Sequence, residues 1–193
     1  MEKERLLAFS DGVIAIIITI MVLELKVPHG DDWAELSKLA PVFLSYVLSF
    51  TYVAIYWNNH HHLLYAADRI NGAIMWANMI LLFCLSLIPF ATGWMGENHF
   101  TSLPTAVYGV ALLMPGLSFL FLQKAIIRLQ GPGGKLAGMV GSQTKERLSM
   151  ALYAAGIALS FAAPWVACVI YVAVALMWLV PDRRIEKALR EKE

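Results

Sequence analysis

Six apolar segments, each close to the length of a bilayer-spanning helix, occupy most of this 193-residue sequence. They cover residues 6–25, 41–63, 70–93, 104–123, 146–162 and 164–180. A helix needs roughly 20 apolar residues to cross a bilayer, and hydrophobic residues make up 59% of the chain, above the roughly 45–50% of soluble domains. The pattern therefore predicts an all-α integral membrane protein with six transmembrane helices, in a single domain over residues 1–193.

Lysine and arginine are distributed unevenly between the predicted loops. Of the 15 lysines and arginines, only Lys26 and Lys38 lie in a loop that follows an odd-numbered segment. Because basic residues concentrate on the cytoplasmic side of membrane proteins, both termini are expected in the cytoplasm. The formal net charge is only +1, and most of the basic residues lie in the predicted cytoplasmic loops and termini. No nucleic-acid partner is therefore expected.

The first segment has some features of a secretory signal peptide, since Lys3 and Arg5 precede its apolar core. However, Asp11 interrupts that core, and no A-x-A cleavage pattern follows it, so a membrane helix is the favoured interpretation. A carboxylate inside such a helix is costly in free energy. Asp11 is therefore a candidate functional residue.

A helical arrangement separates the side chains of this segment into two faces. At about 100° per residue, one face carries Phe9, Gly12, Ile16, Thr19, Ile20 and Leu23. Ser10 and Asp11 point away from that face. An isoleucine-rich face alone is typical of core or lipid contact. If it instead lines a symmetric pore, Asp11 is directed into the helix bundle of its own subunit.

Polar side chains of three predicted helices fall at a similar depth, near the cytoplasmic boundary. They are Asp11 in the first segment, Trp57, His60 and His61 in the second, and Asn71 and Asn78 in the third. Arg5, Phe9 and Ser10 of the first segment are assigned to the same network. Its polar groups can donate hydrogen bonds that make a buried carboxylate tolerable. Such a network can hold helices together or relay protons, and the sequence leaves both roles open.

No metal site, cofactor or catalytic motif is predicted. The histidines at 60–62 are consecutive and point about 100° apart on a helix, so they cannot converge on one ion. Cys84 and Cys168 lie within apolar segments and are typical of small core residues. The glycine-rich stretch 131–143 lacks the ending of a phosphate-binding loop and is interpreted as a flexible connection. No nucleophile motif accompanies the histidines, so an enzyme is not expected.

The first segment carries a short motif of the form R-x-x-x-F-S-D, followed by an Ile/Leu-rich helix. The motif consists of Arg5, Phe9, Ser10 and Asp11. It resembles the first helix of the endosomal and lysosomal potassium channel family, in its prokaryotic branch. The cluster of Trp57, His60 and His61 and the six-segment length of the chain fit the same family.

This resemblance implies a homotetramer in a bacterial plasma membrane, with four first helices around a pore for potassium and other monovalent cations. By position, it implies that Ile16 forms the main hydrophobic constriction, that Ile20 and Leu23 extend it, and that Thr19 adds a layer of hydroxyl groups. A ring of apolar side chains can close a pore to ions by expelling water from its narrowest part. Since the sequence lacks a TVGYG filter, the selectivity for potassium over sodium is expected to be modest.

A proton-coupled secondary transporter that uses Asp11 and the histidines is the alternative. Such transporters are commonly built from two repeats, with ionisable residues near the bilayer midplane. Here the ionisable residues of the predicted spans cluster near one end of the first two segments, and residues 1–95 do not resemble residues 100–193. Both observations favour the channel.

Overall fold

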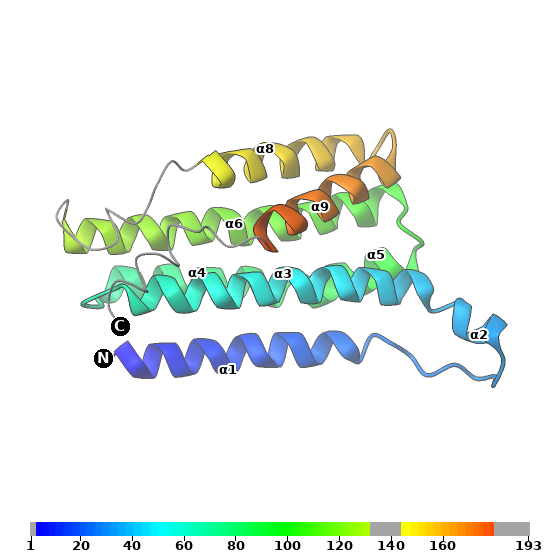
Figure 1. Cartoon of the computed structure of the whole chain (residues 1–193), viewed down its shortest axis with the longest axis horizontal. Coiled ribbons are helices and arrows are strands. Elements are labelled where there is room, and N and C mark those ends of the chain that lie inside the picture. Colours follow the sequence, from blue (N-terminus) through cyan, green and yellow to red (C-terminus); the bar gives the residue numbers. More distant parts are fainter. Residues whose placement is uncertain (1–2, 132–143, 180–193) are drawn as a thin grey trace.

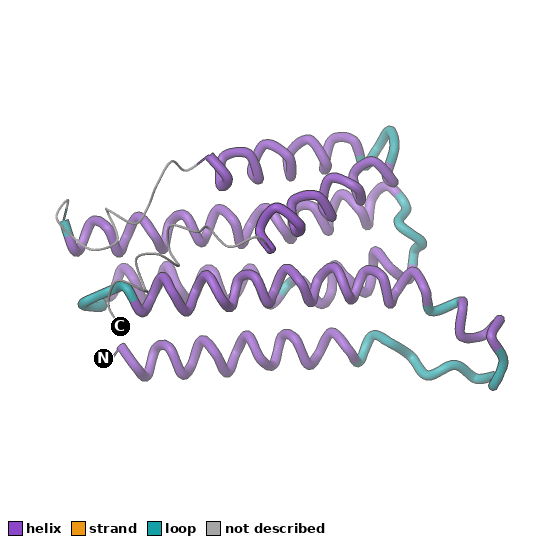
Figure 2. Tube along the Cα trace, in the orientation of Figure 1, coloured by secondary structure: helices purple, strands orange, loops and turns teal. Residues whose placement is uncertain are grey.

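The computed structural model describes residues 3–131 and 144–179, and in these ranges the chain is all helical. The helices are α1 (Lys3–Val22), α2 (Trp33–Ser37), α3 (Ala40–Tyr65), α4 (Gly72–Ser86), α5 (Ile88–Glu97), α6 (Ser102–Gln130), α8 (Thr144–Leu159) and α9 (Pro164–Leu179). All except α2 lie roughly along the long axis of the molecule (Figure 1). Figure 2 shows a longer connection between α1 and α3, which contains the short α2. The predicted all-α fold is confirmed.

Four helical stretches of the described chain are long and apolar enough to cross a membrane: α1, α3, the α4–α5 pair and α6. The last two predicted segments form α8 and α9, which have 16 residues each. A total of six spans therefore stays a prediction. Apart from Gly131, the glycine-rich connection over 131–143 lies outside the described residues.

The third predicted segment consists of two helices in line. α4 ends at Ser86 and α5 begins at Ile88, with Leu87 between them. Pro89 lies in the first turn of α5, and because proline has no backbone N–H it interrupts the hydrogen-bond ladder of a continuous helix. α6 also differs from its prediction, since it continues to Gln130, past residue 123. Its last turns are amphipathic rather than apolar, which a search for apolar runs misses.

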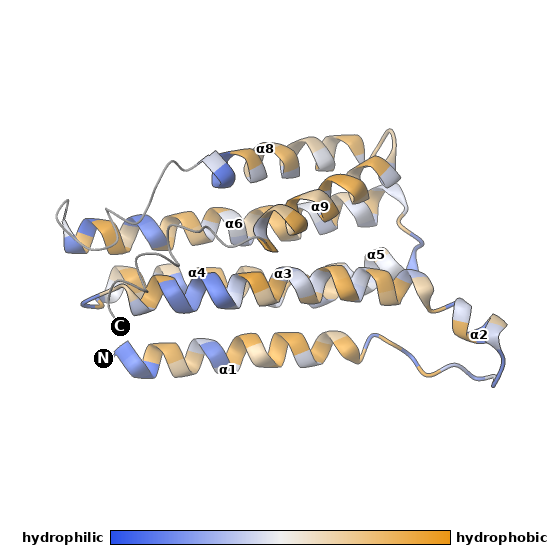
Figure 3. Cartoon of the chain, viewed as in Figure 1, coloured by the Kyte–Doolittle hydropathy of each residue, from blue (hydrophilic) through white to orange (hydrophobic). Residues whose placement is uncertain are grey.

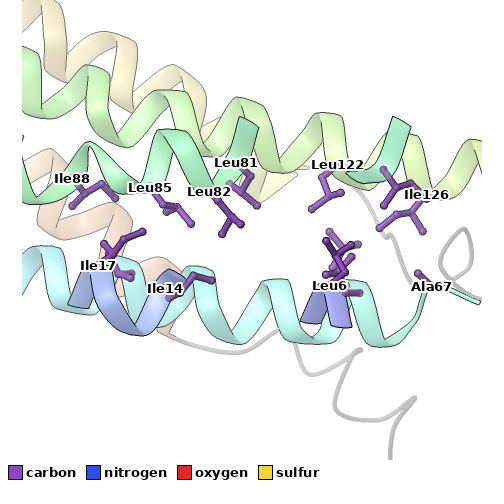
Figure 4. Close-up of a cluster of buried hydrophobic side chains, with 14 of the residues drawn as sticks. Leu6, Ile14, Ile17, Ala67, Leu81, Leu82, Leu85, Ile88, Leu122 and Ile126 are labelled. Atoms are coloured by element: carbon purple, nitrogen blue, oxygen red, sulfur yellow. The ribbon is translucent and has the colours of Figure 1, made fainter. Parts of the chain in front are cut away.

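One cluster of buried apolar side chains joins α1 to its neighbours. Figure 4 shows Ile14 and Ile17 of α1 opposite Leu82, Leu85 and Ile88 of α4 and α5, and Leu6 of α1 near the end of the cluster where Leu122 and Ile126 of α6 lie. Since lipid tails are as apolar as these side chains, close packing rather than exclusion from water holds such helices together. α1 packs on α3, α4 and α5 and lies at the edge of the bundle (Figure 1).

A second cluster, rich in tyrosine, joins α3, α6, α8 and α9. The Tyr52 hydroxyl donates to the Tyr171 carbonyl oxygen at 2.6 Å. Tyr171 packs against the backbone of Gly109 and Gly156, where an added Cβ would lie 2.1 Å and 2.5 Å from atoms of its ring or hydroxyl. These two glycines therefore set how closely α6 and α8 approach α9.

Candidate functional site

One face of α1 is left uncovered by the rest of the chain. Ile16 is 58% exposed and Leu23 is 75% exposed, whereas their neighbour Ile17 is 4% exposed. Ile20 is also exposed, and so is Thr19, whose hydroxyl donates to the Ile16 carbonyl oxygen at 3.0 Å. The side chains predicted for a pore thus share the uncovered face, which in a membrane must meet lipid or another copy of the chain.

Ser10 and Asp11, the polar pair of α1, lie against the bundle. Figure 3 shows that a hydrophilic stretch of α1 and one of α3 occur at similar positions along the long axis. The indole Nε1 of Trp57 donates to Asp11 Oδ1 at 3.0 Å. Asp11 is half-buried, so the carboxylate that the sequence singles out contacts a donor on the next helix.

A buried chain of hydrogen bonds runs beside this contact. Asn78 Nδ2 donates to Ser10 Oγ at 2.9 Å, and Ser10 Oγ donates to the Leu6 carbonyl oxygen at 2.8 Å. The distance from His60 Nε2 to Asn78 Oδ1 is 2.7 Å. Since an amide oxygen only accepts hydrogen bonds, His60 donates from Nε2. All three polar side chains are fully buried, and they connect α1, α4 and α3.

His60 carries one buried atom without a partner. Its Nδ1 makes no hydrogen bond to any residue in the described part of the chain. With Nε2 as the donor, a neutral imidazole presents only a lone pair at Nδ1. The hydrogen-bond chain therefore fixes the tautomer and the orientation of this ring.

Four residues predicted for this network have other surroundings. The Asn71 side chain caps the start of α4, where it accepts a hydrogen bond from the Ile74 backbone at 3.0 Å. His61 is exposed and stacks on the ring of Tyr65, with 6.2 Å between centroids. Arg5 is exposed, and within residues 3–131 and 144–179 it forms no hydrogen bond or ion pair. Phe9, the remaining motif residue, is also exposed.

Two contacts that the sequence analysis missed attach the ends of α1 to the bundle. Lys3 Nζ donates to the Tyr65 carbonyl oxygen at 2.6 Å and lies 5.1 Å from the centre of the Tyr65 ring. At the other end, Lys26 pairs with Glu97, and the hydrogen bond and charge of Glu97 raise the pKa of Lys26 above its ordinary value. Both pairs join residues far apart in sequence, and no local pattern marks them.

Comparisons with known proteins identify relatives of this chain. A family model described as endosomal/lysosomal potassium channel TMEM175 matches residues 5–89. A potassium channel of Chryseobacterium sp. (strain P1-3) is 54% identical over 191 residues, which cover 99% of this chain and 100% of that protein. The endosomal/lysosomal proton channel TMEM175 of Homo sapiens is 34% identical over 103 residues, which cover 47% of this chain and 20% of that protein.

The fold has a solved counterpart. The crystal structure of a lysosomal potassium-selective channel TMEM175 homolog from Chamaesiphon minutus superposes with a TM-score of 0.80 at 28% sequence identity, and the superposition covers 100% of this chain and 99% of that chain. The family resemblance drawn from the sequence is thereby confirmed. Because the similarity to the Chryseobacterium channel extends over nearly the whole of both sequences, this chain belongs to the TMEM175 potassium channel family.

Proposed function

We propose that this chain is the subunit of a potassium-permeable channel in which four copies of α1 surround the ion path. The names of its bacterial relatives support potassium as the permeant ion. The observation that carries the proposed pore is the uncovered apolar face of α1, which lies opposite the buried polar contacts of the same helix. Six spans, cytoplasmic termini and a plasma-membrane location belong to the same proposal.

The pore narrows where branched apolar side chains meet. Ile16, Ile20 and Leu23 are spaced by four and three residues, so on a helix rising 1.5 Å per residue they form successive rings about 6 Å and 4.5 Å apart. Four such side chains at one level can exclude water, which closes the path to ions. A small outward movement or rotation of α1 readmits water.

Thr19 lies between the rings of Ile16 and Ile20. Its hydroxyl hydrogen is used in the bond to the Ile16 carbonyl oxygen, so the oxygen retains lone-pair capacity for a cation. Four such oxygens replace only part of the hydration shell of an ion. The preference for potassium over sodium is therefore modest.

The buried hydrogen bonds set which residues of α1 face the pore. A rotation of α1 by one residue, about 100°, would replace Ile16 with a neighbour at the constriction. Asn78 opposes such a rotation, because it would leave the buried Nδ2 group of Asn78 without its acceptor, Ser10 Oγ. Ser10 is the point on α1 where this restraint acts. We assign the network a structural role rather than proton transfer.

The directions of α1 and α9 support the proposed cytoplasmic location of both termini. α9 runs opposite to α1, so its last described residues point to the end of the bundle where α1 begins (Figure 1). The basic residues of the sequence concentrate toward that same end of the spans, which favours the cytoplasm for it. The superposition on the Chamaesiphon minutus channel covers 100% of this chain and 99% of that chain. This coverage supports a single domain with the same membrane spans as that channel.

Single-channel recording tests this proposal. The purified full chain is reconstituted into a planar bilayer, and current is measured in opposed potassium and sodium gradients. We expect unitary current steps and a reversal potential displaced toward that of potassium. Flux without unitary steps would instead support the proton-coupled transporter, and a reversal potential that follows sodium would contradict the proposed permeant ion.

A further inference from the structure

A cleft is lined by residues of α3, α6, α8 and α9. Of these helices, α6, α8 and α9 lie on the side of the bundle away from α1 (Figure 1). The space of the cleft, counted to the open mouth, is about 480 Å³. The proposed ion path and the buried network on α1 use none of the residues that line this cleft.

Five of the twelve residues that line the cleft are aromatic. Tyr56 and Phe119 meet edge to face with 6.3 Å between their centroids, and Tyr52 and Tyr153 lie 6.3 Å apart at a tilt. Trp178 completes the walls. The faces of such rings are electronegative and attract cations that have shed their water.

The wall contributed by Trp178 is held in place. Its Nε1 donates to Ser149 Oγ at 2.8 Å, and Ser149 Oγ in turn donates to the Lys145 carbonyl oxygen at 2.8 Å. Ser149 is fully buried. The ring therefore does not need to be ordered when a ligand enters, which reduces the free-energy cost of binding.

Glu146 is the one charged side chain among the described residues that line the cleft. It is half-buried, and it forms no hydrogen bond or ion pair within the described ranges of the chain. A carboxylate beside aromatic faces complements a cation whose surface is apolar. The surface of the cleft is mostly apolar, which suits the methyl groups of a methylated ammonium ion better than a potassium ion, since potassium is held by a shell of oxygen ligands.

We propose that this cleft binds a small organic ammonium ion, with its charge near Glu146 and its methyl groups against Tyr56, Phe119 and Trp178. Two sources supply this chemistry: a free ammonium compound in solution, or the ammonium headgroup of a membrane lipid. The site is independent of ion permeation, so its failure would leave the proposed channel intact.

Choline binding tests the site. The full chain is placed in nanodiscs of phosphatidylglycerol, which has no ammonium group, and is titrated with choline in a calorimeter. The matched ligand is the neutral carbon analogue of choline, in which a tert-butyl group replaces the trimethylammonium group. We expect saturable binding of choline and much weaker binding of the analogue, because only choline is attracted by the carboxylate and the ring faces.

Substitutions in the cleft and outside it test where choline binds. Glu146→Gln keeps the shape of the side chain and should weaken choline binding about tenfold, and Tyr56→Leu should weaken it as well. Glu4→Gln, in the first turn of α1, should leave the affinity unchanged. Absence of saturable binding, equal binding of the neutral analogue, or an unchanged affinity in a folded Glu146→Gln variant would each overturn the proposal.

Changing the lipid of the nanodisc distinguishes a lipid headgroup from a free ammonium ion as the ligand. If the site takes a lipid headgroup, phosphatidylcholine in the disc should compete with added choline and lower its apparent affinity. An affinity that is equal in both kinds of disc assigns the site to a free ammonium ion. Both results support the ligand class, and they differ only in its source.

Discussion

Ile16 and Ile17 are neighbours in sequence with the same side chain, and they lie in different surroundings. Ile17 is packed against α4 and α5, whereas Ile16 faces away from its own chain. The helical period alone separates them, because consecutive residues point about 100° apart. A substitution at each position should therefore have a different effect.

Replacing Ile16 with Asn should increase the potassium current severalfold, because four amides at the constriction retain water where four isoleucines exclude it. Current per reconstituted channel is the measurement. Ile17→Asn is the control, and it should lower the thermal stability of the protein instead, because it buries an amide among apolar side chains. An Ile16→Asn channel with unchanged current and selectivity would contradict the constriction.

Asp11 should matter more for assembly than for ion preference. Asp11→Ala removes the acceptor of the Trp57 indole, and losing a hydrogen bond to a charged group costs about 1.5–3 kcal/mol. We expect a lower midpoint of thermal dissociation in size-exclusion chromatography, with little change in the potassium to sodium permeability ratio. Asp31→Ala, in the exposed loop after α1, is the control. Intact tetramers with inverted selectivity would place Asp11 in the ion path.

Asn71 and Asn78 show which roles of single side chains can be predicted from the sequence. Both were predicted for the polar network, since they lie on one face of a helix. Asn78 is buried there, but Asn71 precedes the first turn and caps it. Asparagine directly before an apolar helix is a strong capping signal, so this role could have been predicted. The pairing of Ser10 with Asn78 depends on the packing of α1 against α4, which local sequence does not determine.

Helices α1, α3 and α4 are tied together by a few buried polar atoms. Asn78→Ala should destabilise the protein by about 1–3 kcal/mol, because the His60 Nε2 hydrogen is then buried without an acceptor. Thermal unfolding followed by tryptophan fluorescence measures this loss. The control, Asn58→Ala, removes an exposed amide from α3 and should change the unfolding midpoint little. Equal midpoints for the two variants would show that the network does not hold the helices.

Close approach of α6 and α9 depends on the lack of a side chain at Gly109. An added methyl group would overlap the Tyr171 hydroxyl, and such overpacking typically costs about 1–3 kcal/mol. Gly109→Ala should therefore lower the unfolding midpoint. Gly72→Ala places a methyl group where no atom lies within 4 Å, and it should leave the midpoint nearly unchanged. A stable Gly109→Ala variant would contradict this packing.

The limits of most helices could be predicted because hydropathy changes sharply at their ends. The break at Leu87 is less visible, since apolar residues continue through it, and only Pro89 marks it. The end of α6 was missed for the opposite reason: the helix continues while Lys124 and Arg128 make its sequence polar. The hydropathy pattern marks the part of a helix that lies in the membrane. The full length of a helix also depends on packing outside the membrane.

The assembled protein should contain four copies of the chain. In one copy, the face of α1 that carries Ile16 is apolar and uncovered, and in the proposed tetramer this face surrounds the pore axis. Native mass spectrometry of the detergent-solubilised protein should give a mass of four chains of 21.4 kDa each. A mass of one chain under conditions that preserve channel activity would contradict the arrangement.

Cysteine accessibility at positions 16 and 17 tests most directly whether α1 lines the pore. In a background with Cys84→Ala and Cys168→Ala, single Ile16→Cys and Ile17→Cys channels are recorded while silver ions are applied. The proposed pore predicts a rapid, irreversible block of the Ile16→Cys current and no block of the Ile17→Cys current. Block of Ile17→Cys alone, or an Ile16→Cys current that silver leaves unchanged, would contradict it.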